Sequence, residues 1–207
     1  GVIVKDYNPG QLATDYENAG VSAISVITEK NYFYGSKRHL SDVKQSVNLP
    51  VLRKDFIVDP YQVYEAYELG ADMVLLIVAC LSDKELKELH QLILEYGMTP
   101  LVEVHNEKEL RRALAIDPIL LGINNRNLKT FEVDIETSFR LKELIPASIK
   151  VISESGIKSS SDIARLKEAG FFGALVGESI LKSKDVSGKI HQLLTALPIT
   201  SPFPKGE

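Results

Sequence analysis

Residues 73–104 read MVLLIVACLSDKELKELHQLILEYGMTPLVEV, and this stretch decides the fold because two apolar runs flank an amphipathic segment. The runs 73–78 and 100–104 are almost continuously apolar, which is typical of strands buried on both faces of a parallel sheet. Residues 82–97 begin with a serine cap, place apolar side chains three and four residues apart, and end in Gly97. The stretch therefore predicts a strand, a helix and a second strand of one parallel sheet.

The same unit recurs along the chain. Short runs rich in Val, Ile and Leu occur seven times, at residues 23–27, 50–52, 73–78, 100–104, 119–123, 150–153 and 173–177. A helical segment ends in glycine, with a strand beginning within three residues, at Gly20, Gly70, Gly97 and Gly170. Glycine suits the left-handed conformation that ends a helix. Strands that alternate with helices in this way predict an α/β fold with a parallel sheet.

Two architectures share this pattern, the doubly wound sheet and the (β/α)₈ TIM barrel. The sequence contains no G-x-G-x-x-G or P-loop motif, which a doubly wound nucleotide-binding sheet normally carries. We therefore expect a (β/α)₈ barrel, whose active site lies at the carboxyl ends of the strands. Polar residues and glycines gather at or just past the apolar runs: Thr28, Glu29, Lys54, Asp55, Glu103, His105, Asn124, Asn125, Arg126, Glu154, Ser155, Gly156, Gly177 and Glu178.

The composition favours a small-molecule ligand. The 207 residues carry a formal net charge of −4 and no block of lysine or arginine, so nucleic acid and anionic membranes are not expected partners. No apolar run approaches the roughly 20 residues of a transmembrane helix. The single cysteine, Cys80, excludes an internal disulfide framework and fits a reducing cytoplasm. No Cys or His cluster has zinc-ligand spacing, so no metal site is expected.

Two ionisable side chains stand out against their apolar surroundings. Lys54 follows an apolar run and suits a general acid, a Schiff-base nucleophile, a phosphate ligand or a surface loop. Glu103 interrupts the run PLVEVH, where burial raises the pKa of a carboxylate unless a cation pairs with it, so it suits a general base or an ion pair. His105 shares the face of Glu103 but is interpreted as a loop residue. The remaining histidines are interpreted as helix surface residues: His39, His90 and His191.

Three loops after predicted strands could bind a substrate. GINNRNL, residues 122–128, offers two amides and Arg126, which can grip a carboxylate in bidentate fashion, although Asn-rich loops are often only turns. SESGIKSSSDI, residues 153–163, and LVGESI, residues 175–180, each place a glycine between a strand and a helix. Backbone N–H groups at such positions can hold a phosphate, and ordinary tight turns are the alternative.

Seven segments together resemble the indole-3-glycerol phosphate synthase family: SVITEKNYFYGS, PVLRKDFIVDPYQ, GADMVLLIVACLS, YGMTPLVEVHNEKEL, GINNRNLKTFEVD, VISESGI and ALVGESI. The resemblance runs through the whole core. It implies a (β/α)₈ barrel that converts 1-(o-carboxyphenylamino)-1-deoxyribulose 5-phosphate to indole-3-glycerol phosphate, with loss of CO₂ and water. It implies a small phosphorylated aromatic substrate and no metal or organic cofactor, and it leaves association with other tryptophan-pathway enzymes open.

The resemblance also implies residue roles. Lys54 would be the general acid that protonates the ribulose carbonyl, Glu103 the general base, and Asn124 and Glu154 would assist and orient. A lysine suits this task if its pKa is lowered, as a neighbouring Arg53 or desolvation would do. The implied substrate-binding residues are Phe33 and Phe56 around the aromatic ring, Arg126 at the anthranilate carboxylate, Ser155, Gly156, Gly177 and Glu178 around the phosphate, and Leu175.

The family carries a Glu-x-Lys-x-x-Ser-Pro-Ser segment on its first barrel strand, and these 207 residues contain no such segment. We therefore expect strands two to eight of the barrel, in a single, N-terminally incomplete domain over residues 1–197 with a polar C-terminal tail over 198–207. Two unpaired sheet edges would then make this chain alone poorly active. The alternatives are another phosphate-binding barrel enzyme, either a ketol isomerase or a Schiff-base aldolase using Lys54, and a non-catalytic barrel fragment.

Overall fold

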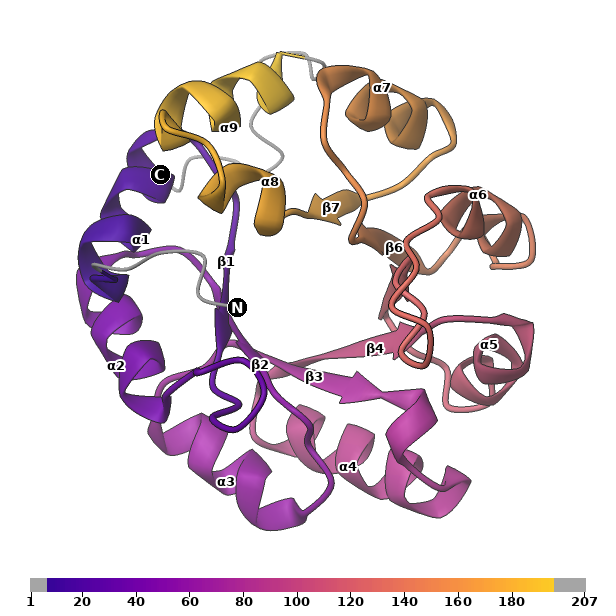
Figure 1. Cartoon of the computed structure of the whole chain (residues 1–207). Coiled ribbons are helices and arrows are strands. Elements are labelled where there is room, and N and C mark those ends of the chain that lie inside the picture. Colours follow the sequence, from indigo (N-terminus) through magenta and orange to yellow (C-terminus); the bar gives the residue numbers. More distant parts are fainter. Residues whose placement is uncertain (1–6, 196–207) are drawn as a thin grey trace, which may run out of the picture.

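In the computed structural model, which describes residues 7–195, seven parallel strands form one sheet in the order β1-β2-β3-β4-β5-β6-β7. The strands are β1 (Ile24–Ile27), β2 (Val51–Lys54), β3 (Met73–Ile77), β4 (Thr99–Val104), β5 (Leu120–Asn124), β6 (Lys150–Glu154) and β7 (Gly173–Leu175). All seven predicted strands are therefore confirmed, as is the α/β class with a parallel sheet. The sheet curls into a half-barrel around a central space (Figure 1).

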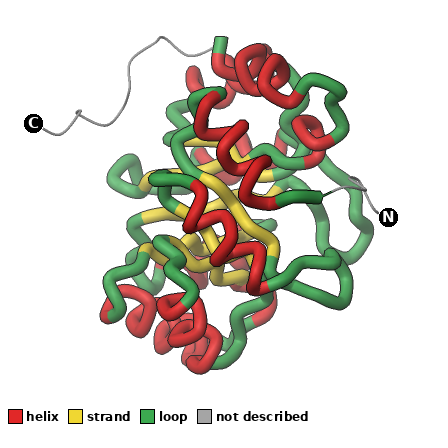
Figure 2. The backbone as a smooth tube through the Cα atoms, turned by 90° about the vertical axis from the view of Figure 1, so that its left-hand side faces the viewer, coloured by secondary structure: helices red, strands yellow, loops and turns green. Residues whose placement is uncertain are grey.

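The helices lie mostly on the outside of the curl, as the side view in Figure 2 also shows; one precedes β1, two follow β7, and the others connect successive strands. They are α1 (Pro9–Asn18), α2 (Lys37–Ser46), α3 (Pro60–Glu68), α4 (Asp83–Glu95), α5 (Glu107–Leu114), α6 (Glu136–Lys142), α7 (Ser160–Glu168), α8 (Glu178–Leu181) and α9 (Val186–Leu194), with a short 3₁₀ helix η1 (Val78–Cys80) after β3. Among the described residues, no helix has the length and apolarity needed to cross a membrane.

Local signals in the sequence set the helix ends. Ser82 and Glu85 form a capping box at the start of α4, in which each side chain accepts a hydrogen bond from the other residue's backbone N–H. The four glycines that are predicted to end helices have φ between +73° and +91°. These values lie in the left-handed region, so the predicted helix ends are confirmed.

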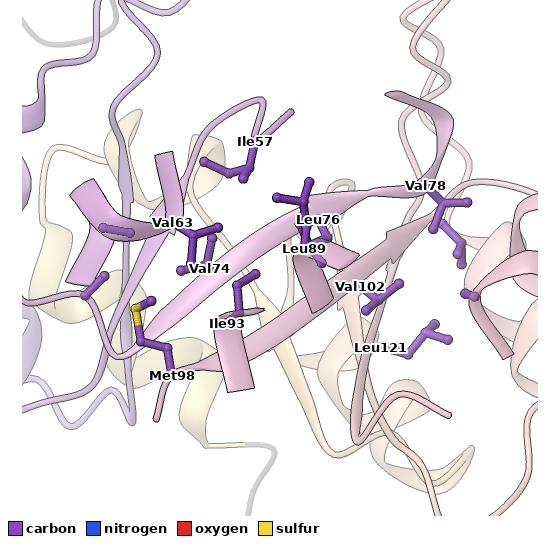
Figure 3. Close-up of a cluster of buried hydrophobic side chains, with 14 of the residues drawn as sticks. Ile57, Val63, Val74, Leu76, Val78, Leu89, Ile93, Met98, Val102 and Leu121 are labelled. Atoms are coloured by element: carbon purple, nitrogen blue, oxygen red, sulfur yellow. The ribbon is translucent and has the colours of Figure 1, made fainter. Parts of the chain in front are cut away.

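Alternation along the strands creates two apolar layers. On β3, Val74 and Leu76 point toward α3 and α4 (Figure 3), whereas Leu75 and Ile77 belong to a separate cluster inside the curled sheet. Because both faces of the strand are buried, its sequence is apolar without alternation. The polar residues at the strand ends lie above this inner cluster, on the side of the site described below.

His90 is buried, with 7% of its surface exposed, so its interpretation as a surface residue is wrong. The buried face of α4 consists of Leu86, Leu89, His90 and Ile93, which is an i, i+3, i+4, i+7 stripe. Burial lowers the pKa of the imidazole and favours its neutral form. Of the other two helix histidines, His191 is exposed and His39 is half-buried.

The two edge strands of the sheet are β1 and β7, and within residues 7–195 neither pairs with a further strand. The outer helix layer nevertheless continues between these edges, because α9 packs against both α1 and α7 (Figure 1). A small apolar cluster supports this part of the layer; its buried members are Ala19, Ile180, Ile190 and Leu193. The predicted tail over residues 198–207 lies outside the described residues, as do the first six residues.

Candidate active site

Lys54 ends β2 and points into the curl of the sheet, between two glutamates. Its Nζ atom lies 3.0 Å from Oε2 of Glu103, on β4, and 3.0 Å from Oε2 of Glu154, on β6. Both glutamates are only 1% exposed, and the lysine side chain is 24% exposed. Alternate strands thus bring together three of the residues that the sequence singled out.

The pKa of Lys54 is raised rather than lowered, so the condition that would make this lysine a stronger acid is not met. Burial alone would lower it, but the charges of Glu154 and Glu103 and their hydrogen bonds to Nζ outweigh this effect. The positive charge of Arg53 does not counteract the two glutamates, because the alternation of side chains along β2 places Arg53 on the outer face of the sheet. There its guanidinium donates to Glu65 Oε2 at 2.7 Å and to the carbonyl oxygen of Gln62 at 2.8 Å. Lys54 therefore stays protonated near neutral pH.

The two carboxylates beside Lys54 differ in charge. Burial raises the pKa of Glu154 to about 7, with the nearby Glu103 charge adding to the effect and Lys54 opposing it. For Glu103, Lys54 and His105 outweigh the effect of burial and hold the pKa well below its usual range. Two carboxyl groups with separated pKa values can serve as a base and a proton donor in one site.

His105 is the first residue after β4, so it lies in the loop as the sequence predicts, and its side chain reaches Glu103. Its Nε2 atom lies 3.2 Å from Glu103 Oε1, and its Nδ1 atom lies 2.9 Å from Glu109 Oε2, at the start of α5. The signal in the sequence was the two-residue spacing from Glu103, which places both side chains on the same side of an extended chain.

Asn124 and Gly122 on β5 shape the floor of the site. The Oδ1 atom of Asn124 accepts hydrogen bonds from Ser155 Oγ at 2.8 Å and from the backbone N–H of Arg126 at 3.0 Å. A Cβ atom at Gly122 would overlap Oε1 of Glu154, so only glycine leaves room for this carboxyl group. Gly122 is not among the predicted site residues, although a glycine inside a strand commonly marks a place where another group comes close to the backbone.

Loops after β1 and β2 place the two aromatic residues. The carboxylate of Glu29 accepts hydrogen bonds from three successive backbone N–H groups, the last being that of Phe33 at 3.0 Å. The backbone of Phe56 is held by Asp55, which accepts from its N–H at 2.8 Å, and by Gln62, which donates to its carbonyl oxygen at 2.9 Å. Both loops are thus built by polar residues beside the strand ends.

A cavity of about 190 Å³ opens above the charged cluster. Predicted site residues among its lining are Phe33, Lys54, Phe56, Glu103, Asn124, Arg126 and Ser155. Ile27, Leu75, Ile77 and Leu128 supply apolar wall. The cavity therefore combines an apolar part, suited to an aromatic group, with ionised groups at one end.

The other predicted residues lie around this cavity without lining it. Glu154 is beneath Lys54, and Leu175 packs against the inner apolar cluster. Gly156 follows β6 with a φ of +79°, and Gly177 precedes α8. Glu178 Oε2 lies 3.0 Å from Arg126 Nη2, so the arginine that is predicted to bind the substrate carboxylate already forms an ion pair with a carboxylate of the protein.

No cluster of three or more His, Cys, Asp or Glu that could hold a metal occurs in residues 7–195.

A protonated lysine between an ionised and a proton-holding carboxyl group, at the carboxyl ends of parallel strands, defines an acid–base enzyme on a curled βα sheet. The family model for indole-3-glycerol phosphate synthase matches residues 1–193. The chain therefore belongs to the indole-3-glycerol phosphate synthase family.

Relatives agree with this assignment, and solved structures agree with the fold. The chain is 47% identical to an indole-3-glycerol phosphate synthase of Ruminiclostridium cellulolyticum and 48% identical to that of Desulfotalea psychrophila. Each match covers 93% of this chain and 74% of the relative. Among solved structures, 3-hexulose-6-phosphate synthase from Salmonella typhimurium is similar with a TM-score of 0.78, at 14% identity over 94% of this chain and 95% of that chain. At that identity the likeness concerns the fold alone. The family match gives no support to a ketol isomerase or a Schiff-base aldolase.

Proposed function

We propose that the chain converts 1-(o-carboxyphenylamino)-1-deoxyribulose 5-phosphate to indole-3-glycerol phosphate, releasing CO₂ and water, as a carboxy-lyase of tryptophan biosynthesis. The observation that carries this proposal is the position of Lys54 Nζ, 3.0 Å from each of two buried glutamates and at the edge of the cavity. Ring closure needs a proton donor at the ribulose carbonyl, and later steps need a base, and this cluster contains both.

Lys54 acts first in this mechanism. As the aromatic carbon attacks the ribulose carbonyl, negative charge develops on the carbonyl oxygen, and the ammonium group stabilises it and donates a proton. The raised pKa keeps Lys54 charged before the reaction, so the donor is always present. Glu154 lies 3.0 Å away and holds a proton near neutral pH, which places it to reprotonate Lys54.

Glu103 acts later. Its depressed pKa keeps it ionised, and after CO₂ has left it removes a proton from the intermediate, while the reprotonated Lys54 gives its proton to the departing hydroxyl group, which leaves as water. A group with a low pKa is a weak base in the resting site. As Lys54 gives this second proton to the hydroxyl group, Glu103 loses a neighbouring positive charge and its basicity rises.

The substrate would lie in the cavity with its aromatic ring between Phe33 and Phe56. Arg126 would bind the anthranilate carboxylate after exchanging its contact with Glu178 for the substrate. The phosphate would be held by backbone N–H groups of the loop after β6, where Ser155 and Gly156 have φ of +67° and +79°. The remaining proposed contacts are Asn124, which orients the substrate, Gly177 and Glu178, which border the phosphate, and Leu175, which packs against the inner apolar cluster.

We also propose that the seven strands are strands two to eight of a closed (β/α)₈ barrel, in one domain over residues 1–197. The continuous helix layer from α1 through α9 to α7 supports closure by one further strand between β1 and β7. The family segment Glu-x-Lys-x-x-Ser-Pro-Ser would supply that strand and additional catalytic groups. A cytoplasmic location and association with other tryptophan-pathway enzymes stay predictions.

A fluorescence assay for indole-3-glycerol phosphate tests the function, run on this chain and on one extended upstream by the family's first-strand segment. We expect product from the extended chain and little from the shorter one. Lys54→Met should lower kcat of the extended chain by roughly 10²–10⁴-fold. Lys87→Met, on the exposed face of α4, removes a lysine outside the site and is the matched control. No product from the extended chain would contradict the function, and equal turnover of both chains would contradict the poor activity of the shorter one.

A further inference from the structure

His105 lies between two carboxylates, and the proposed mechanism gives it no role. Its Nε2 atom is 3.2 Å from Glu103 Oε1, and its Nδ1 atom is 2.9 Å from Glu109 Oε2. The imidazole side chain is only 8% exposed. The other oxygen of Glu103, Oε2, is the one that contacts Lys54. The imidazole therefore contacts the proposed base on the side away from the proposed acid.

We propose that His105 is a positioning residue, which holds Oε1 of Glu103 so that Oε2 remains directed at Lys54 and the cavity. The inference rests on the proposed function, because it concerns the base of that reaction. The Nε2–Oε1 contact is an ion pair without a hydrogen bond, so the charge of the imidazolium attracts Oε1 while Lys54 binds Oε2. A carboxylate with only one oxygen held can rotate about its side-chain bonds, whereas attraction at both oxygens restricts that rotation. A fixed orientation matters because acid–base catalysis depends on hydrogen-bond geometry to the reacting atom.

The chain around His105 is itself held in place. Asn106 caps α5 by accepting a hydrogen bond from the Glu109 backbone N–H at 3.0 Å, and its side-chain amide donates to Glu109 Oε1 at 2.6 Å. The backbone N–H of His105 also donates to Glu109 Oε2 at 2.8 Å. The start of α5 thus fixes Glu109, Glu109 fixes the imidazole, and the imidazole contacts Glu103.

The charges of His105 and its two glutamate neighbours favour the position of the imidazole between them. The titratable groups that contact the imidazole are Glu103 from β4 and Glu109 from α5, and the charges of the same two glutamates act on the thiol of Cys80 in η1. Burial lowers the pKa of His105, but contacts with the two glutamates outweigh it and raise the pKa to about 9. Burial, with the same two glutamate charges, raises the pKa of Cys80, so the thiol stays neutral. A charged imidazole also helps to keep Glu103 ionised.

Substitution of His105 in the upstream-extended chain tests the inference. We expect His105→Ala to lower kcat at least about ten-fold with little change in KM, a part of the roughly 10²–10⁴-fold that a positioned base contributes. His105→Gln keeps an N–H donor without the charge, so it should restore part of kcat and move the acidic limb of the kcat/KM profile to higher pH. His90→Gln is the matched control, because His90 is also buried but lies on α4, away from Glu103. A loss of kcat no larger than that of the control, with an unchanged pH profile, would show a purely structural role and overturn the inference.

An NMR titration of the imidazole separates this inference from the proposed function, since it needs no turnover. Glu103→Gln should lower the pKa of His105, because it removes one of the two carboxylates that raise it. An unchanged His105 pKa would mean that the contact does not exist, and this would overturn the inference even in an active enzyme. If Glu103→Gln lowers the pKa of His105 but the extended wild-type chain forms no product, the contact is real and the proposed function is overturned, and the catalytic role of His105 with it.

Discussion

Replacing Glu154 with glutamine should remove a pH dependence of stability that this one carboxyl group creates. Burial raises its pKa in the folded protein from 4.5 to about 7. Between these values the unfolded chain has released the proton and the folded chain still holds it. Because the folded state then binds more protons, the free energy of unfolding falls as pH rises. The contribution is fully present below pH 4.5 and is lost as pH rises through about 7.

The magnitude follows from the same interval. The step from 4.5 to about 7, at roughly 1.4 kcal/mol per pH unit, amounts to about 3–4 kcal/mol. Neighbouring groups titrate in other windows. The lowered pKa of Glu103 acts below pH 4.5, where its stabilisation is lost as pH falls. The pKa of His105, raised from 6.5 to about 9, acts above pH 6.5, where its stabilisation is lost as pH rises. Between pH 4.5 and 6.5 the ionisation of Glu154 is therefore separate from those of Glu103 and His105, and the lowered pKa of His90 acts equally in the wild type and in Glu154→Gln.

Urea unfolding followed by circular dichroism measures the effect at several pH values within this range. The wild type should lose about 2–3 kcal/mol relative to Glu154→Gln between pH 4.5 and 6.5, because the amide cannot ionise. Glu68→Gln, an exposed residue at the end of α3, is the matched control and should follow the wild type. Parallel curves for the wild type and Glu154→Gln would show that Glu154 is ionised in the fold, and would refute its role as a proton donor to Lys54.

Three further substitutions probe the site and its scaffold. Gly122→Ala should displace the Glu154 carboxyl group, lowering kcat at least about ten-fold and the free energy of unfolding by about 1–3 kcal/mol; normal turnover would contradict the close approach. Gly97→Ala adds only backbone strain, since φ is +73° and no atom lies within 4 Å of the added Cβ, so it should cost about 1 kcal/mol in urea unfolding without changing kcat. Glu178→Gln should free Arg126 for the substrate carboxylate and lower KM a few-fold; an unchanged KM would argue against that binding role.

The fold was predictable from the sequence because its signals are local. A buried parallel strand must be apolar on both faces, and a helix that turns back into a strand needs a left-handed residue, which Gly97 and Gly170 supply. The convergence of polar residues was predictable for a topological reason, since parallel strands end at the same edge of the sheet. Closure of the barrel is not determined by these signals, because it depends on what pairs with β1 and β7.

Contacts between strands were less predictable. Lys54 is 49 residues from Glu103 and 100 residues from Glu154, and no local pattern states which strand-end groups meet. The roles of the histidines were missed for a different reason. His90 lies on the apolar stripe of α4, so periodicity contains the signal for its burial, but residue type favours the surface. His105 depends on Glu109 for its orientation, and this contact appears only once α5 has formed.

The upward shift of the Lys54 pKa shows that moving one position along a strand changes the charges that surround a side chain. Arg53 and Lys54 are adjacent and both basic, yet alternation sends the arginine outward to Glu65 and the lysine inward to Glu103 and Glu154. In sequence, Arg53 is the nearest cation to Lys54, which favours a lowered pKa. In the sheet, the opposite faces of β2 separate the two charges and place each beside carboxylates, which raises the pKa of Lys54. A shift of β2 by one residue would exchange the two side chains and remove the ammonium group from the cavity. The register of β2 is thus a condition for the acid–base chemistry as well as for the fold.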